Sequence, residues 1–185
     1  MSDTADTADA ADAADTAGDG PTGRPRRGIT FFGPPAEAPL LQDTDLMSFP
    51  EVDPAVADQF VEWGLSAGHL TRVLFRSDDM TLVWAWFGPD HILPRHSHSA
   101  DCLYFVVSGE ARLGNRTVPA GAGFFVPADA PYAYTAGPEG IQILEFRGVN
   151  ASDMQISESA DRWNRIVETV RTNQDEWQAR SAPMR

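Results

Sequence analysis

The sequence predicts an all-β fold: a single barrel of short antiparallel strands, with an N-terminal arm, a short N-terminal helix and a C-terminal amphipathic helix. Three observations predict it. Short apolar segments recur between residues 69 and 147, separated by Gly, Pro, Asp and Ser, as in sandwiches and barrels. A stretch with helical periodicity follows the last of them. The chain has 185 residues, of which 42% are hydrophobic, and this is enough for one packed core.

The N-terminal 27 residues are predicted to be a disordered acidic tail and linker. Residues 1–20 contain six Asp and no basic residue, and after Met1 they hold no large apolar side chain that could join a core. The first apolar cluster begins at Ile29. Three parts are therefore predicted: the tail and linker (1–27), the barrel with its N-terminal arm (28–150), and a C-terminal helix that packs on the barrel or on a partner subunit (151–185).

Two helices are predicted, one before and one after the strands. The first is Pro54–Trp63, with Asp53 as its N-cap and Gly64 as its stop. The second spans about Ser159–Ala179 and is amphipathic. Its apolar stripe consists of Trp163, Ile166, Val167, Val170 and Trp177. Because strands and helices do not alternate between them, a doubly wound α/β fold is not expected.

The strands are predicted from apolar alternation and from turn residues. They are His69–Arg76, Thr81–Phe87, Ile92–His98, Cys102–Val107, Ala111–Leu113, Gly123–Val126, Tyr132–Thr135 and Ile141–Phe146. The turns between them include residues 77–79, 108–110 and 136–140. Trp84 and Trp86 share one strand face, and we expect them in the core or at a dimer interface.

The charge and the cysteine content exclude several classes of protein. The net charge of −13 argues against nonspecific binding to nucleic acids or anionic membranes, because both need a basic surface. The single cysteine, Cys102, excludes an internal disulfide framework. No apolar run approaches the roughly 20 residues of a membrane span, and no basic-then-apolar leader is visible. A cytoplasmic location is the expectation.

The residues best suited to chemistry are His96 and His98. Residues two apart on a strand share a face, with Cα atoms about 6.5–7 Å apart, so the two imidazoles can converge on one ion inside a barrel. By the same alternation Cys102 and Tyr104 share a face of the next strand. We expect Tyr104 and Tyr132 to point into the same cavity as the histidines.

Two stretches of the chain resemble the motifs of the cupin superfamily, whose members are small double-stranded β-helix barrels. The first motif has the form G-x5-HxH-x3,4-E-x6-G, and His96, His98 and Gly109 fit it. The second has the form G-x5-PxG-x2-H-x3-N, and Gly121 and Pro127 fit its opening. The resemblance implies a double-stranded β-helix for the predicted barrel.

The departures from these motifs bear on the metal site. Asp90 stands at the opening Gly position, and Cys102 stands where the family has its glutamate. In the second motif Asp129, Tyr132 and Ala136 replace the second Gly, the histidine and the closing Asn. Two of the four usual ligands are thus replaced. Cysteine and tyrosine bind a metal only after losing a proton.

Two further residues lie close to the motif. Asp101 is adjacent to Cys102 and could complete a two-histidine, one-carboxylate set, which suits non-haem iron. Strand parity instead places Asp101 at the turn or facing outward. His91 lies five residues before His96, so on a straight strand it faces away, and only a bulge near Pro94 would reverse this.

The resemblance implies a metal-dependent enzyme that acts on a small organic molecule, with dioxygenase, lyase, isomerase and cyclase chemistry all open. His96, His98 and Cys102 are the candidate ligands of one divalent ion, which iron, manganese, nickel or zinc would suit. Tyr104 and Tyr132 are the candidate catalytic residues, because a phenol near a divalent ion loses its proton more readily. As plain core residues, Cys102 would be a buried small hydrophobe and each tyrosine would fill the barrel.

The alternative function is a non-catalytic, small-molecule-binding cupin whose metal site has decayed, which the replacements at Cys102 and Tyr132 favour. The resemblance to small cupin barrels also implies a homodimer, because an exposed strand edge must be covered. Ile29, Phe31 and Phe32 offer apolar side chains for an exchange of N-terminal arms.

Overall fold

The computed structural model describes residues 28–48, 65–149 and 152–184. The chain divides into two compact units, residues 1–31 and 32–185, and every helix and strand described lies in the second unit. The predicted helix Pro54–Trp63 and the predicted tail lie outside the described residues. None of the described helices has the length and hydropathy that crossing a membrane requires.

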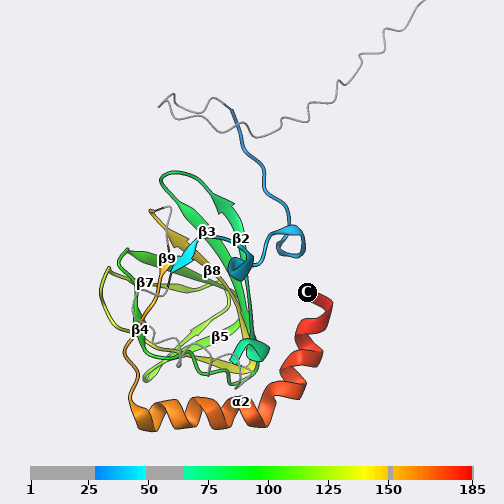
Figure 1. Cartoon of the computed structure of the whole chain (residues 1–185), viewed down its shortest axis with the longest axis vertical. Coiled ribbons are helices and arrows are strands. Elements are labelled where there is room, and N and C mark those ends of the chain that lie inside the picture. Colours follow the sequence, from blue (N-terminus) through cyan, green and yellow to red (C-terminus); the bar gives the residue numbers. More distant parts are fainter. Residues whose placement is uncertain (1–27, 49–64, 150–151, 185) are drawn as a thin grey trace, which may run out of the picture. The chain divides into compact units, whose positions relative to one another are not determined.

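Antiparallel strands dominate the structure (Figure 1). Six strands form the main sheet, in the order β2-β3-β8-β5-β6, with β7 paired to β5. Their bounds are β2 His69–Arg76, β3 Thr81–Phe87, β5 Cys102–Leu113, β6 Arg116–Pro119, β7 Gly123–Val126 and β8 Thr135–Arg147. The predicted all-β fold is confirmed.

Two smaller sheets complete the described strands. β1 (Met47–Ser48) pairs in parallel with β9 (Ser152–Asp153). β4 (His96–Ser97) pairs antiparallel with β10 (Gln155–Ile156). Among the described residues the three sheets are not joined by strand pairing into a closed barrel.

Alternation predicted some strands to the residue and misplaced others. β2, β3 and β7 have the predicted bounds. Two predicted strands and the turn between them form the single long strand β5, and β8 runs through the predicted turn at 136–140. Glycines bend these strands without ending them: Gly109 has φ +72°, and a Cβ there would lie 2.0 Å from the backbone oxygen of Gly140.

Two further strand predictions were wrong, and one strand was missed. Of the strand predicted at Ile92–His98, only β4 forms. The strand predicted at Tyr132–Thr135 is absent, although Tyr132 makes an isolated antiparallel bridge with His96. β6 was not predicted, because its sequence, Arg-Thr-Val-Pro, shows too little apolar alternation.

The C-terminal helix α2 spans Ala160–Ser181, and the Ser159 hydroxyl caps it by accepting a hydrogen bond from the backbone N–H of Arg162 at 3.4 Å. Four members of its predicted apolar stripe are buried: Ile166, Val167, Val170 and Trp177. Short 3-10 helices are Pro35–Glu37, Leu41–Asp43, Leu65–Gly68 and Ala182–Met184.

Two apolar clusters flank the main sheet. The outer one joins Leu70, Trp84 and Trp86 to the buried face of α2, where the Trp177 indole N–H donates to the Pro89 carbonyl at 3.0 Å. Trp84 and Trp86 are therefore core residues.

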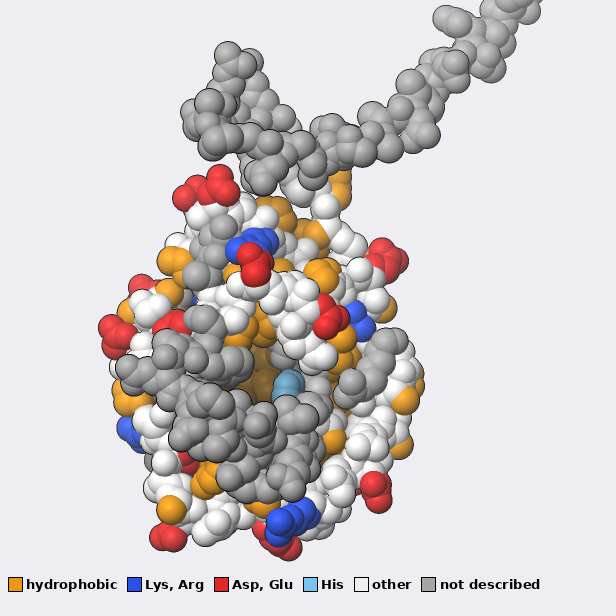
Figure 2. Space-filling model, in the orientation of Figure 1, with side chains coloured by type: hydrophobic (Ala, Val, Ile, Leu, Met, Phe, Trp, Pro, Cys, Tyr) orange, Lys and Arg blue, Asp and Glu red, His pale blue; other side chains and the backbone are white. Residues whose placement is uncertain are grey.

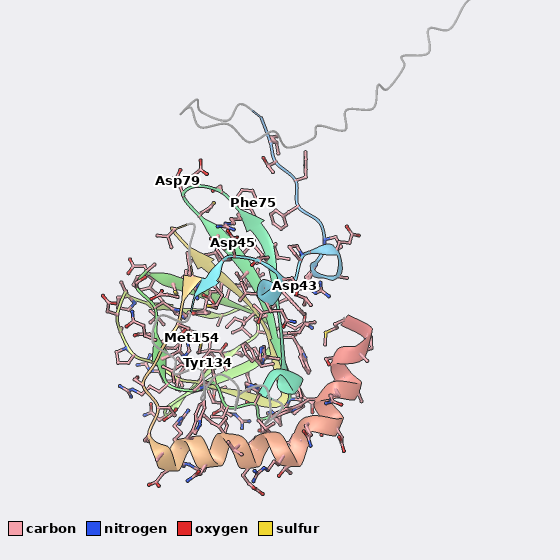
Figure 3. All side chains as sticks on the ribbon, in the orientation of Figure 1. Asp43, Asp45, Phe75, Asp79, Tyr134 and Met154 are labelled. Atoms are coloured by element: carbon pink, nitrogen blue, oxygen red, sulfur yellow. The ribbon has the colours of Figure 1, made fainter. Side chains whose placement is uncertain are left out.

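The inner cluster includes Val106, Ile141, Ile143 and Tyr134. The turn that carries Asp79 lies at one end of the main sheet, and Tyr134 lies near the other (Figure 3). The inner face is the one on which the candidate site is built.

Candidate metal centre and tyrosine pair

Alternation along β5 places two predicted site residues on the inner face of the sheet. The side chains of Cys102 and Tyr104 are buried, with exposed fractions of 0% and 2%, whereas Leu103 and Phe105 between and after them are exposed. Tyr104 stacks on Phe124 with ring centroids 4.7 Å apart, which fixes the direction of its phenol.

Backbone carbonyls orient both histidines. His96 lies in β4 and its Nδ1–H donates to the carbonyl oxygen of Pro94 at 2.7 Å. The Nδ1 of His98 contacts the carbonyl oxygen of Asp153 in the same way. Because each Nδ1 faces a carbonyl, each Nε2 carries a lone pair that can accept a hydrogen bond, take up a proton or bind a metal.

The tyrosine pair links the two histidines to β5. The hydroxyl of Tyr132 lies 2.8 Å from Nε2 of His96 and 3.2 Å from Nε2 of His98. It also contacts the hydroxyl of Tyr104. Since Nε2 of His96 is an acceptor, Tyr132 donates to His96 and accepts from Tyr104. The three side chains form a continuous chain of hydrogen bonds.

β8 contributes a carboxylate and a guanidinium that sequence reasoning missed. Strand pairing places Glu145 opposite Tyr104 and Arg147 opposite Cys102. Arg147 donates from Nε to the Cys102 sulfur at 3.2 Å and forms an ion pair with Glu145. Its Nη2 contacts the His98 ring, 3.2 Å from Nε2 and 3.3 Å from Nδ1. The signal was available, because strand parity continues from the inward Ile143 to both residues.

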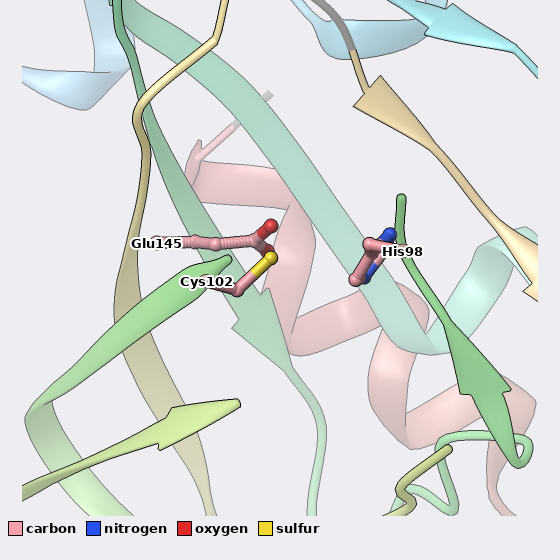
Figure 4. A group of neighbouring side chains, drawn as sticks. All are labelled: His98, Cys102 and Glu145. Atoms are coloured by element: carbon pink, nitrogen blue, oxygen red, sulfur yellow. The ribbon is translucent and has the colours of Figure 1, made fainter. Parts of the chain in front are cut away.

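The ligand atoms of His98, Cys102 and Glu145 all lie within 4.8 Å of one another, and the Cys102 and Glu145 side chains point toward His98 (Figure 4). An imidazole, a thiol and a carboxylate are a donor set that suits zinc and other transition metals. The residues present therefore fit a divalent ion, and they form a candidate metal site. His96 directs its Nε2 to Tyr132 at the edge of this group.

Burial sets the protonation states of the site. It lowers the pKa of His96 and of His98 to about 4, so both imidazoles are neutral at pH 7. It raises the pKa of the Cys102 thiol, and Glu145 adds to this effect. Burial followed by the Glu145 charge also raises the pKa of Tyr104 and of Tyr132, so both phenols are neutral.

Two residues considered from the sequence lie apart from this group. The Asp101 carboxylate accepts a hydrogen bond from the backbone N–H of Ala128 at 2.8 Å, in the region of the turn before β5. His91 packs against Phe87 and Trp177, with ring centroids 5.2 Å from each. The parity argument against both as partners of His96 and His98 agrees with these positions.

The molecular surface is hollowed on the face shown in Figure 2, where a histidine side chain is visible in the recess beside hydrophobic side chains. The five residues named from the sequence, His96, His98, Cys102, Tyr104 and Tyr132, come together in one buried group.

No family model matches the chain. Over 68 residues it is 37% identical to the dimethylsulfoniopropionate lyase DddW of Ruegeria pomeroyi. The match covers 35% of this chain and 45% of that protein, so the chain matches less than half the length of this curated relative.

Several solved structures are similar, all with TM-scores below 0.5. They include a structure from a study of the dimethylsulfoniopropionate lyases RdDddP and RnDddQII, with 28% identity, coverage of 49% of this chain and 53% of that one, and a TM-score of 0.43. An RmlC-like cupin from Shewanella frigidimarina has 18% identity, coverage of 65% and 93%, and a TM-score of 0.46. The polyketide cyclase RemF of Streptomyces resistomycificus has 18% identity, coverage of 60% and 84%, and a TM-score of 0.45. One of these structures is named as a cupin, the superfamily whose motifs the sequence resembles.

Proposed function

We propose that this chain is a metal-dependent cupin lyase that removes a proton from a small organic substrate and expels a leaving group from the neighbouring carbon. The observation that carries the proposal is the chain of hydrogen bonds from Tyr104 through Tyr132 to His96, which ends on a neutral imidazole beside a candidate metal site. A buried proton path of this kind suits general base catalysis.

The chain of hydrogen bonds from Tyr104 through Tyr132 to His96 can act as a proton relay, and this relay avoids forming a buried phenolate. A substrate C–H proton passes to the Tyr104 oxygen as the Tyr104 proton moves to Tyr132 and the Tyr132 proton moves to Nε2 of His96. The C–H bonding pair becomes the new double bond, and the leaving group departs with the electrons of its own bond. Both phenols stay neutral, which their raised pKa values favour, and His96 becomes an imidazolium.

The imidazolium has a carboxylate in its neighbourhood. Burial lowers the pKa of His96 to about 4; the Pro94 carbonyl and the charge of Glu145 raise it, and the charges of His98 and Arg147 lower it. His96 therefore takes up the proton transiently and returns it once product has left. Its Nδ1–H, held by Pro94, keeps the ring fixed while Nε2 gains and loses the proton.

His98, Cys102 and Glu145 are the residues that would hold the metal ion, with Cys102 as thiolate. A divalent ion bound there supplies Lewis-acid stabilisation of negative charge that develops on the substrate.

The relative with 37% identity gives the first substrate to test, because its name is that of a dimethylsulfoniopropionate lyase. Elimination from that substrate breaks a C–S bond and releases dimethyl sulfide and acrylate. The substrate has an acidic proton next to its carboxylate and a good leaving group, which are the two features the relay needs.

The test is metal content and elimination activity of full-length protein purified without a histidine tag. We expect about one transition metal per chain and release of dimethyl sulfide that a chelator abolishes and added metal restores. Metal-loaded protein that eliminates nothing from dimethylsulfoniopropionate or from related β-substituted carboxylates would contradict the proposed lyase function.

One observation favours a second function, a small-molecule-binding cupin without catalysis. The guanidinium of Arg147 contacts His98, Cys102 and Glu145, so the candidate ligands already have a cationic partner. Protein that carries no metal, gains none at millimolar zinc or iron, and still binds small carboxylates would support that function.

A further inference from the structure

One buried side chain contacts every member of the candidate metal site. Arg147 donates to the sulfur of Cys102, forms an ion pair with Glu145, and contacts the His98 ring at Nε2 and Nδ1. Its exposed fraction is 4%. Contacts with all three candidate ligands place the guanidinium where a shared cation would be bound.

The chemistry of a guanidinium matches these partners. It carries a permanent positive charge and five donors in a planar fork, so it can satisfy a carboxylate, a sulfur and an imidazole lone pair at once. Burial lowers the pKa of Arg147, but the charge of Glu145 outweighs this and holds it above its usual value. The group is a fixed cation under all physiological conditions.

A divalent ion and this guanidinium compete for the same lone pairs. The Cys102 sulfur and the Glu145 carboxylate now face the guanidinium, and a metal ion bound to them would need the space that the guanidinium fills beside His98. At close range in a buried site, two cations also repel each other strongly. Both cannot occupy the site together.

We infer that the Arg147 guanidinium is an internal cation that occupies the site formed by His98, Cys102 and Glu145, and that a divalent ion is bound only when Arg147 moves out. This deepens the proposed function, since it rests on the same metal site and says how its occupancy is controlled. On exchange the metal ion enters, the Cys102 thiol releases its proton to solvent, and Arg147 loses its contacts with all three ligands.

The experiment measures the Zn²⁺ dissociation constant of the full chain by competition with a chromophoric chelator. Arg147→Met keeps an unbranched apolar stem and removes the charge. We expect it to bind Zn²⁺ at least about tenfold more tightly than the wild-type chain, because the competing cation is gone and Glu145 is left without its ion pair.

Arg72→Met is the matched control. Arg72 is also a buried arginine of the main sheet. Its Nη2 donates to the carbonyl of Met184 at 2.9 Å, and Met184 is not part of the candidate metal site. We expect its Zn²⁺ affinity to equal that of the wild-type chain. Equal or weaker binding by folded Arg147→Met would overturn the inference.

A second measurement on the wild-type chain covers the case in which Arg147→Met does not fold. Saturation with Zn²⁺ should shift or broaden the arginine Nε–H resonance of Arg147, identified as the buried arginine signal that persists in Arg72→Met. A resonance unchanged in the saturated protein would overturn the inference.

The two proposals fail separately. Tight zinc binding by Arg147→Met with no lyase activity in any form contradicts the lyase function and leaves the inference standing. Lyase activity in the wild-type chain together with unchanged affinity in Arg147→Met contradicts the inference alone.

Discussion

The hydroxyl groups of Tyr104 and Tyr132 contact each other across 28 positions of sequence, one from the inner face of β5 and one from the segment that bridges to His96. Tyr104 is buried and Tyr132 is partly buried, and burial raises the pKa of each. The contact therefore joins two neutral hydroxyls, and the direction of proton donation along it is set by the acceptor nitrogen of His96.

Tyr104→Phe is expected to lower turnover about 10²–10⁴-fold, because it removes the first oxygen of the proton relay. Stability should change little, because the phenylalanine keeps the ring that stacks on Phe124. Steady-state kinetics and thermal unfolding, measured on the same preparation, check both expectations.

Tyr134→Phe is the control, because Tyr134 is a buried tyrosine of the inner cluster that packs edge-on against Phe87. Its turnover should match the wild-type chain. A Tyr104→Phe chain with full turnover would move the catalytic role elsewhere, and Tyr132 is the next residue to change.

Replacing both His96 and His98 with alanine is expected to abolish metal content while the strands stay folded. His98 is one of the three candidate ligands, and His96 orients Tyr132 beside them. Metal analysis after dialysis and near-ultraviolet circular dichroism measure the two expectations. His91→Ala is the control, since His91 is equally buried but packs against Trp177. Full metal occupancy in the double variant would show that the metal is bound elsewhere.

Stability is expected to fall as the pH is lowered from about 7 to 5. Burial lowers the pKa of His96 and His98 to about 4 and that of His91 to about 3, whereas each is near 6.5 when unfolded. Between these values the unfolded chain binds more protons than the folded chain, so acid favours unfolding. Each histidine contributes on the order of 2 kcal/mol over this range.

Urea unfolding at pH 7 and pH 5 measures this dependence. His91→Gln should show a smaller loss between the two pH values, because one titrating group has been removed. A urea unfolding midpoint that is the same at both pH values would contradict this prediction, because it would mean that the imidazoles reach water in the folded chain and that their pKa values are not lowered.

We predict that the chain is a homodimer. The resemblance to small cupins implies it, and the described surface carries apolar side chains on β5 and β7: Leu103, Phe105, Val107 and Phe125. Sedimentation equilibrium at micromolar concentration should give twice the mass of 20.1 kDa. Only the monomer mass at that concentration would contradict the prediction. A variant with Phe31 and Phe32 changed to Ser tests whether the N-terminal arm carries the association.

Local alternation was enough to predict β2, β3 and β7, because each is a continuous run of inward and outward side chains between clear turns. It failed at Gly109, where a glycine that reads as a turn is a bend inside a long strand. The difference depends on partners far away in sequence: β5 continues because β8 pairs along both sides of the bend.

Only part of the site could be predicted, because the remainder depends on pairing between strands that are far apart in sequence. His96, His98, Cys102 and Tyr104 lie within nine residues, so strand parity alone groups them. Arg147 joins them only through the pairing of β8 with β5, which sets Arg147 opposite Cys102. Parity along β8 predicts that Arg147 faces inward, but its place opposite Cys102 depends on the register between β8 and β5, which pairs residues far apart in sequence.

The strict alternation of β5 constrains how this protein can evolve. Its even-numbered positions 102, 104 and 106 are buried, and its odd-numbered positions 103, 105 and 107 are exposed. A single codon inserted inside the strand, after position 103, would exchange the two sets beyond it, sending a phenol to the surface and a phenylalanine toward the interior. Lineages that diversify this site must therefore do so by substitution, while insertions accumulate in the turns that β5 connects.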